Sequence, residues 1–213
     1  VPRGKRQGVG RHGRLARADV ALHQAQHGHV RGHVRPDRVH GTLLIVDEVQ
    51  SGVGRTGAAF AAELYGLQPD LLTTAKALGG GFPCSALLLT EDLAAQLKSG
   101  DLGTTFGGGP MACALVSTVI EVIKRDRLLE NVRTLSAELQ KSAITGPVTG
   151  VQGRGFLLGL RCKRPAKDVQ AALLARDILV GTSSDPAVVR LLPPLTLERQ
   201  HVQTLCAALA DIG

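Results

Sequence analysis

The sequence lacks the features of a membrane or secreted protein. None of its apolar runs approaches the roughly 18 residues of a membrane span, and its basic N-terminal stretch is not followed by the apolar segment of a secretory signal. No C-x-x-C pair is present, which argues against a zinc site or a disulfide framework. We therefore expect no metal, a cytoplasmic location, and core thiols at the scattered cysteines Cys84, Cys113, Cys162 and Cys206.

Aromatic residues are missing from residues 1–40, although this segment is strongly basic. It holds nine Lys and Arg against two Asp, which equals the net charge of the whole chain, +7, and it holds six of the seven histidines. A nucleic-acid arm would need aromatic side chains to stack bases. A metal site built on His23 with His27, or on His29 with His33, would need further ligands. Both alternatives stay open, and the sequence favours neither.

Residues 1–40 also lack sustained apolar periodicity, so we assign no secondary structure to them. An excess of Arg, Gly, Ala and His is typical of GC-rich coding DNA translated out of frame. We expect a frame-shifted or otherwise non-native segment, which the upstream DNA would test. A remnant of an expression tag is the weaker alternative, because "VPRG" resembles part of a protease site.

The remainder of the chain has balanced charge and the pattern of an α/β protein. Continuous apolar runs predict strands at 42–46, 70–74 and 85–90. Helices are predicted at 58–66, from Thr90 to Leu97, from Pro110 to Asp126, and over an amphipathic stretch with Leu128, Val132, Leu135 and Leu139 on one face. Short strands and two helical patterns follow beyond about residue 148, which predicts a smaller α+β domain.

Charged residues stand where two of the predicted strands end. Asp47 and Glu48 close the run "LLIV", and Lys76 follows "DLLTT". Ligands of open α/β sheets bind outside the carboxyl ends of the strands, so Asp47 and Lys76 are expected to face one crevice. The alternative is an ion pair at the sheet edge. The glycine-rich stretches "GRTG" and "ALGGGFP" do not have the spacing of nucleotide-binding loops, and we interpret them as turns that allow close backbone approach.

Three stretches in register carry a family resemblance. "DEVQSGVGRTG", "TTAKALGGGFP" and "GTTFGGGPMACA" closely resemble class III pyridoxal-phosphate (PLP) aminotransferases, and the acetylornithine aminotransferase branch most of all. The resemblance runs from Gly41 to the C-terminus. It implies a fragment of fold type I, with residues 41–145 from the PLP-binding large domain and its connecting helix, and residues 146–213 from the small C-terminal domain.

The resemblance also assigns roles. Asp47 matches the carboxylate that pairs with the pyridine nitrogen, Val49 would pack on the ring, and Gln50 would bind the phenolic oxygen. Glu48 lies in the same cofactor-binding stretch, although a structural polar contact is the preferred interpretation. Lys76 matches the lysine that binds PLP covalently and moves protons.

More distant residues also match family positions. Thr105 matches a threonine that contacts the phosphate in the partner subunit of a homodimer, and Thr104 matches a substrate contact. Arg190 matches the arginine that binds a substrate carboxylate. Gly109 departs from the family's usual Asn just before Pro110, a tolerable change at an N-cap.

The implied reaction transfers the terminal amino group of N2-acetylornithine to 2-oxoglutarate, in arginine biosynthesis. Ornithine, succinylornithine, 4-aminobutyrate or another ω-amino donor are alternatives, as is a non-catalytic remnant or basic-armed binding protein. The phosphate loop, the stacking aromatic ring, a substrate arginine and the G-E-x-G stretch of the family's N-terminal half have no match here. We therefore expect an incomplete site, with little or no transaminase activity for this chain alone.

Overall fold

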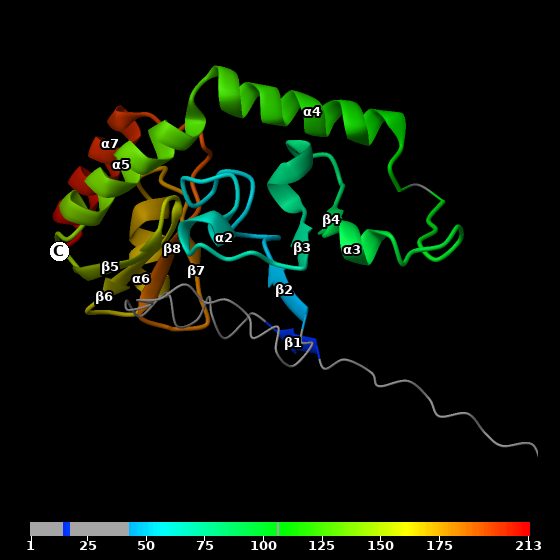
Figure 1. Cartoon of the computed structure of the whole chain (residues 1–213). Helices are drawn as coiled ribbons and strands as arrows, with labels where there is room; N and C mark the ends of the chain where they lie inside the picture. The colour runs from blue at the N-terminus through cyan, green and yellow to red at the C-terminus, as the bar shows by residue number, and fades with distance from the viewer. Residues whose placement is uncertain (1–14, 18–42, 106) are drawn as a thin grey trace, which may run out of the picture.

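Two four-stranded sheets organise the chain (Figure 1). In the computed structural model, residues 15–17, 43–105 and 107–213 are described, and residues 15–17 only by their backbone. The paired histidines proposed as metal ligands lie outside these residues. Within the described part of the chain, no group of His, Cys, Asp and Glu could hold a metal ion, and no helix is long and apolar enough to cross a bilayer.

The first sheet has the order β1-β2-β3-β4. Strands β1 (Leu15–Arg17), β2 (Leu43–Asp47) and β3 (Leu71–Thr74) are parallel, and β4 (Ala86–Leu89) runs antiparallel to β3. The three predicted strands are confirmed. Periodicity assigns no element to residues 1–40, yet β1 lies within them, because the pairing of this three-residue strand with β2 leaves no periodic signal in the sequence.

Helical segments connect the strands of the first sheet and lead from it to the second sheet. They are α2 (Ala61–Leu64), the 3₁₀ helix η2 (Lys76–Gly79), α3 (Glu91–Ala94), α4 (Pro110–Arg125) and α5 (Leu128–Ser142). Gly109 is the N-cap of α4 and Pro110 its first residue, as predicted. Thr90 is the N-cap of α3 but makes no side-chain cap bond, and the helix ends at Ala94 rather than at Leu97, whose side chain is exposed.

The second sheet holds the main hydrophobic core. It contains β5 (Val148–Arg154), β6 (Leu157–Cys162), β7 (Gly181–Thr182) and β8 (Val188–Leu191), with α6 (Ala166–Leu174) and α7 (Arg199–Asp211). The predicted face of α5 packs into this core with both helices. Each fully buried aliphatic side chain contributes about 1.5–3 kcal/mol. Helix α5 thus packs with the second sheet, whereas the sequence-based division at residues 145 and 146 assigns it to the same domain as the first sheet.

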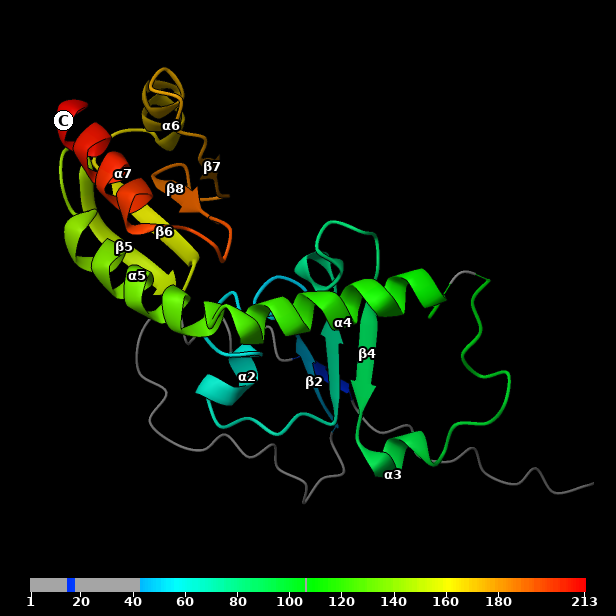
Figure 2. The ribbon, with the colours of Figure 1, turned by 90° about the horizontal axis from the view of Figure 1, so that it is seen from above.

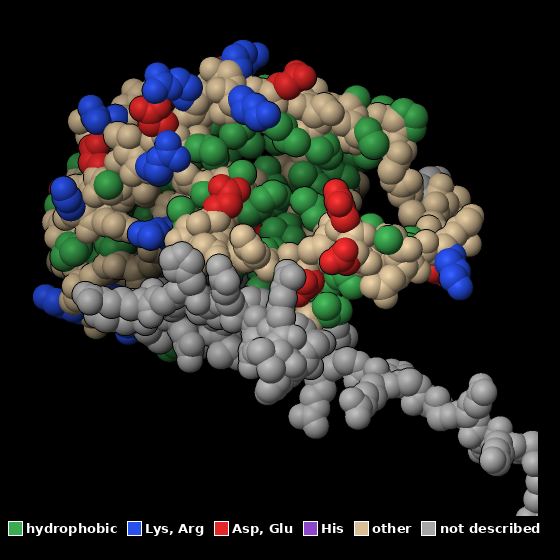
Figure 3. Space-filling model, in the orientation of Figure 1, with side chains coloured by type: hydrophobic (Ala, Val, Ile, Leu, Met, Phe, Trp, Pro, Cys, Tyr) green, Lys and Arg blue, Asp and Glu red, His purple; other side chains and the backbone are tan. Residues whose placement is uncertain are grey.

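The first sheet is much less covered. Its core cluster has only Val46 and Ala62 fully buried. Leu87 and Leu88 of β4 are adjacent, so they point to opposite faces of the sheet, and both are exposed, at 48% and 45%. Helix α4 contacts η2 and α5 (Figure 2) and has no fully buried residue. Apolar side chains accordingly gather on the surface beneath α4 (Figure 3), a pattern typical of contact with further polypeptide.

Candidate cofactor site

Asp47 lies at the carboxyl end of β2, beside the end of β3. The two strands are parallel and pair Asp47 with Thr73. Asp47 Oδ1 accepts hydrogen bonds from the Thr73 hydroxyl at 3.2 Å and from the Val49 backbone N–H at 2.9 Å. The side chain is otherwise exposed. The two bonds hold one carboxylate oxygen, so the group is oriented at the sheet edge while it stays open to a ligand.

Lys76 follows the neighbouring strand and begins η2. Its backbone has φ 51°, in the left-handed region that residues with a side chain rarely adopt. Such a conformation costs on the order of 1–3 kcal/mol, and it clusters at functional sites. The Lys76 side chain is exposed three residues past Thr73, the partner of Asp47. The structure therefore brings Asp47 and Lys76 to the same edge of the sheet, as predicted.

Glu48 points away from this edge. It is 1% exposed, and its two oxygens accept hydrogen bonds from the Ser51 hydroxyl at 2.6 Å and from the Ala62 N–H at 2.7 Å. Ala62 lies in the first turn of α2, where unpaired N–H groups attract a negative charge. These contacts favour the structural interpretation of Glu48 over cofactor binding. Val49 is half-buried and Gln50 exposed, directly after Asp47.

Thr104 and Thr105 lie elsewhere. Both are exposed in the loop between α3 and α4. This loop extends beyond β4, on the side away from the second sheet (Figures 1 and 2). Among the described residues, neither side chain hydrogen-bonds to Asp47 or Lys76. The structure does not bring these threonines to the Asp47 edge of their own chain.

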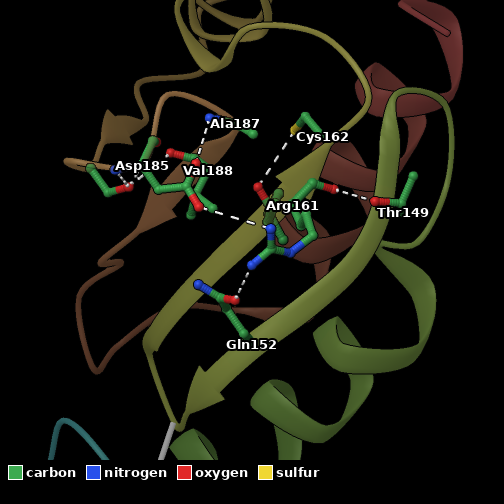
Figure 4. Close-up of polar contacts among 9 residues, drawn as sticks. Thr149, Gln152, Arg161, Cys162, Asp185, Ala187 and Val188 are labelled. Carbon is green, nitrogen blue, oxygen red and sulfur yellow. Dashed lines mark hydrogen bonds and ion pairs between the residues drawn. The ribbon is translucent and has the colours of Figure 1, made fainter. Parts of the chain in front are cut away.

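Arg190 lies on the outer face of the second sheet, where Arg161 is a second candidate for anion binding. The register pairs Gly159 with Arg190 and Arg161 with Val188, so both arginines project from the same face. Arg161 is engaged by the Gln152 side chain at 3.2 Å and by Asp185 at 3.8 Å (Figure 4). Arg190, in contrast, has no hydrogen-bond or ion-pair partner among the described side chains.

The Arg190 side chain extends over β7, where glycine makes room for it. A Cβ at Gly181 would lie 3.4 Å from Arg190 Nε. Arg190 also lines a mainly apolar pocket of about 920 Å³, formed by β7, β8, the segment after β8 and the start of α7. The exposed guanidinium is thus a cation at the margin of an apolar surface, which suits a ligand with one carboxylate.

Sequence reasoning missed one contact, made by the glycine-rich loop after β2. Residues 51–54 and 56–58 are buried, which is unusual for a loop. The Arg55 side chain donates from Nη1 to the Pro193 carbonyl, and the Arg55 backbone carbonyl accepts from the Phe156 N–H at 2.8 Å. Burial lowers the pKa of the Arg55 guanidinium. The glycines "GVGRTG" were the available signal, and they confirm the predicted close approach: a Cβ at Gly54 would lie 2.9 Å from the Leu195 side chain.

An oriented acid and a lysine in a strained turn, both at the carboxyl edge of a sheet in an α/β fold, make this edge a candidate ligand site. The class III aminotransferase family model matches residues 36–212, starting slightly before the expected Gly41. Acetylornithine aminotransferase of Methanocaldococcus jannaschii is 42% identical over 178 residues, which cover 80% of this chain and 44% of that protein. The Mesorhizobium japonicum enzyme of the same name is 43% identical over 165 residues, covering 74% and 41%.

Solved structures give the same result. Acetylornithine aminotransferase from Elizabethkingia anophelis superposes with a TM-score of 0.76 at 30% identity, covering 82% of this chain and 48% of that one. Ornithine aminotransferase from Toxoplasma gondii superposes with a TM-score of 0.75 at 29% identity, covering 82% of this chain and 44% of that one. The chain belongs to the class III aminotransferases, with the fold-type I architecture. It spans about half the length of the curated relatives that it matches.

Proposed function

We propose that this chain contributes to a PLP-dependent transamination that moves the terminal amino group of N2-acetylornithine to 2-oxoglutarate, in arginine biosynthesis. The observation that carries the proposal is the meeting of Asp47 and Lys76 at the ends of adjacent parallel strands. Matches to acetylornithine aminotransferases at about 40% identity support the amino donor. A related ornithine aminotransferase holds PLP at partial occupancy in its active site, which supports the cofactor.

The residues at the sheet edge fit this cofactor. Bound PLP supplies an electron-accepting ring that eases removal of the proton from the carbon bearing the substrate amine. Asp47, held through one oxygen by Thr73 and Val49, would pair with the protonated ring nitrogen. Lys76 would hold the cofactor covalently and, once displaced by the substrate amine, move the proton at that carbon. Val49 and Gln50 follow Asp47 closely enough to contact the same ring.

Arg190 would bind the substrate carboxylate. Arg190 is exposed and free of described side-chain partners, whereas Arg161 on the same face is already engaged by Asp185 and Gln152. A planar guanidinium can bind a carboxylate through two parallel hydrogen bonds. The resulting charge complementarity favours amino acids over simple amines as donors.

The active form would be a homodimer. Thr105 would contact the cofactor phosphate bound by the partner subunit and Thr104 the substrate there, because their loop lies away from the Asp47 edge of the same chain. The exposed apolar side chains of β4 and α4 would provide the contact surface. We expect such an enzyme to act in the cytoplasm.

Ornithine is the second candidate donor, because the Toxoplasma gondii ornithine aminotransferase matches at a TM-score of 0.75. Because this chain alone is expected to have little or no activity, the test uses PLP-loaded protein completed with the family's N-terminal half. Glutamate formation from 2-oxoglutarate is measured, with N2-acetylornithine and ornithine compared at equal concentrations. We expect higher kcat/KM for N2-acetylornithine, and no turnover for Lys76→Ala. Lys98→Ala, on an exposed loop, is the matched control and should keep wild-type activity. Equal turnover by Lys76→Ala would refute the proposal.

A further inference from the structure

The buried loop after β2 joins the two sheets through Arg55. The guanidinium donates to the carbonyl of Pro193, three residues after Arg190, and the two hydrogen-bonded residues are 138 positions apart. The Arg55 carbonyl accepts from Phe156, which is fully buried in the second core. Arg55 therefore contacts both the segment after β8 and the β5–β6 turn.

Neighbouring contacts hold the Arg55 loop and the segment after β8 in place. Arg133 of α5 donates to the Gly57 carbonyl at 2.7 Å, on the side of the loop. Asn131, on the same helix, donates to the carbonyls of Leu195 and Leu197, both at 2.9 Å, on the side of the segment after β8. Helix α5 thus binds both the Arg55 loop and the segment after β8, and Arg55 joins these two segments directly.

The same loop is strained and leaves little room for adjustment. Val53 has φ 54°, an outlier for a β-branched residue. Added Cβ atoms would lie 2.8 Å from the Arg133 side chain at Gly57 and 2.7 Å from the Glu48 carbonyl at Gly52. Because the loop is buried, strained and close-packed, it cannot deform easily, so a shift at one end moves the other end as well.

We propose that Arg55 is a positioning residue that fixes the carboxylate-binding Arg190 relative to the cofactor-binding Asp47. The proposal rests on the function proposed above. Arg55 lies eight residues after Asp47, and its hydrogen-bond acceptor lies three residues after Arg190. One side chain therefore sets the separation between the site for the ring and the site for the carboxylate. It touches neither substrate nor cofactor, so its effect is confined to ligands that use both sites.

A pair of amino donors isolates this effect. N2-acetylornithine carries the carboxylate, and N-acetylputrescine is the same molecule without it. Arg55→Met keeps the aliphatic bulk and removes the donor, whereas Arg55→Lys keeps a cationic donor. In the PLP-loaded protein, Arg55→Met should raise KM for N2-acetylornithine about tenfold, with kcat nearly unchanged and kcat/KM for N-acetylputrescine unchanged. Arg55→Lys should recover most of the loss.

A second readout does not depend on activity. In hydrogen–deuterium exchange of the full chain, Arg55→Met should speed exchange over residues 192–198 and at Phe156, and Arg55→Lys less so. The matched control is Arg125→Met, an exposed arginine of α4, which should change neither readout. Equal losses for both amino donors, or unchanged exchange in Arg55→Met, would overturn the positioning role. If the wild-type protein turns over neither donor, the proposed function fails, and exchange alone decides whether Arg55 couples the two segments.

Discussion

A methyl group added at Gly155 should loosen the contact between the glycine-rich loop and the second sheet. Gly155 forms the β5–β6 turn with φ +55°. A Cβ there would lie 2.5 Å from the Arg55 carbonyl oxygen and 2.6 Å from two backbone atoms of Thr56. Backbone atoms cannot swing aside as a flexible side chain can, so the turn or the loop must move.

Two costs add at this position. A left-handed conformation costs a residue with a Cβ about 1–2 kcal/mol. Overpacking against the loop adds about 1–3 kcal/mol. Gly66→Ala isolates the first cost, because Gly66 has φ +61° and a Cβ there would meet nothing within 4 Å. Gly150 lies in the same sheet, in the strand that leads to Gly155, has open space where a Cβ would be, and has no positive φ. Gly150→Ala should therefore leave the free energy of unfolding unchanged.

Urea unfolding followed by circular dichroism measures these differences, with m-values compared to detect any loss of two-state behaviour. We expect Gly155→Ala to lower the free energy of unfolding by about 1–3 kcal/mol more than Gly66→Ala does. If Gly155→Ala were no more destabilising than Gly66→Ala, the loop would not be packed against the turn, and Arg55 could not hold the two segments at a fixed separation.

Three further predictions follow from buried and exposed polar groups. Glu48→Ala should lower the free energy of unfolding by about 2–4 kcal/mol, because the Ser51 hydroxyl and the Ala62 N–H lose their acceptor, and Glu48→Gln should cost less, both measured by urea unfolding. Burial raises the pKa of the Cys162 thiol above its ordinary value of 9.0. The unfolded chain therefore releases this proton first as pH rises, so stability should fall above about pH 9. Unfolding across that range should show a shallower fall for Cys162→Ala. Arg190→Lys should raise KM for N2-acetylornithine in steady-state kinetics while leaving N-acetylputrescine unaffected.

Local signals in the sequence predicted much of the fold and of the sheet-edge site. Apolar runs gave β2 and β3, and Pro110 marked the first residue of α4. The positions of Asp47 and Lys76 followed from the rule that parallel strands present their carboxyl ends at one edge. These features depend on residues close together in sequence, or on the regular geometry of a sheet.

Contacts between distant segments could not be predicted in the same way. The strand β1 exists through its pairing with β2, and Arg55 finds its acceptor 138 residues away. Glu48 illustrates the same limit at short range. Its burial depends on where α2 begins and on the alternation of side chains along β2, so an acid beside Asp47 faces the opposite side.

Reduction with borohydride shows whether Lys76 binds PLP covalently beside Asp47. The chain is incubated with PLP, reduced, digested and analysed by mass spectrometry. We expect the reduced cofactor on the peptide containing Lys76, no labelling of Lys76→Ala, and weaker labelling of Asp47→Ala. Labelling spread over other lysines, and unchanged in Lys76→Ala, would show that Lys76 is not the residue that binds PLP.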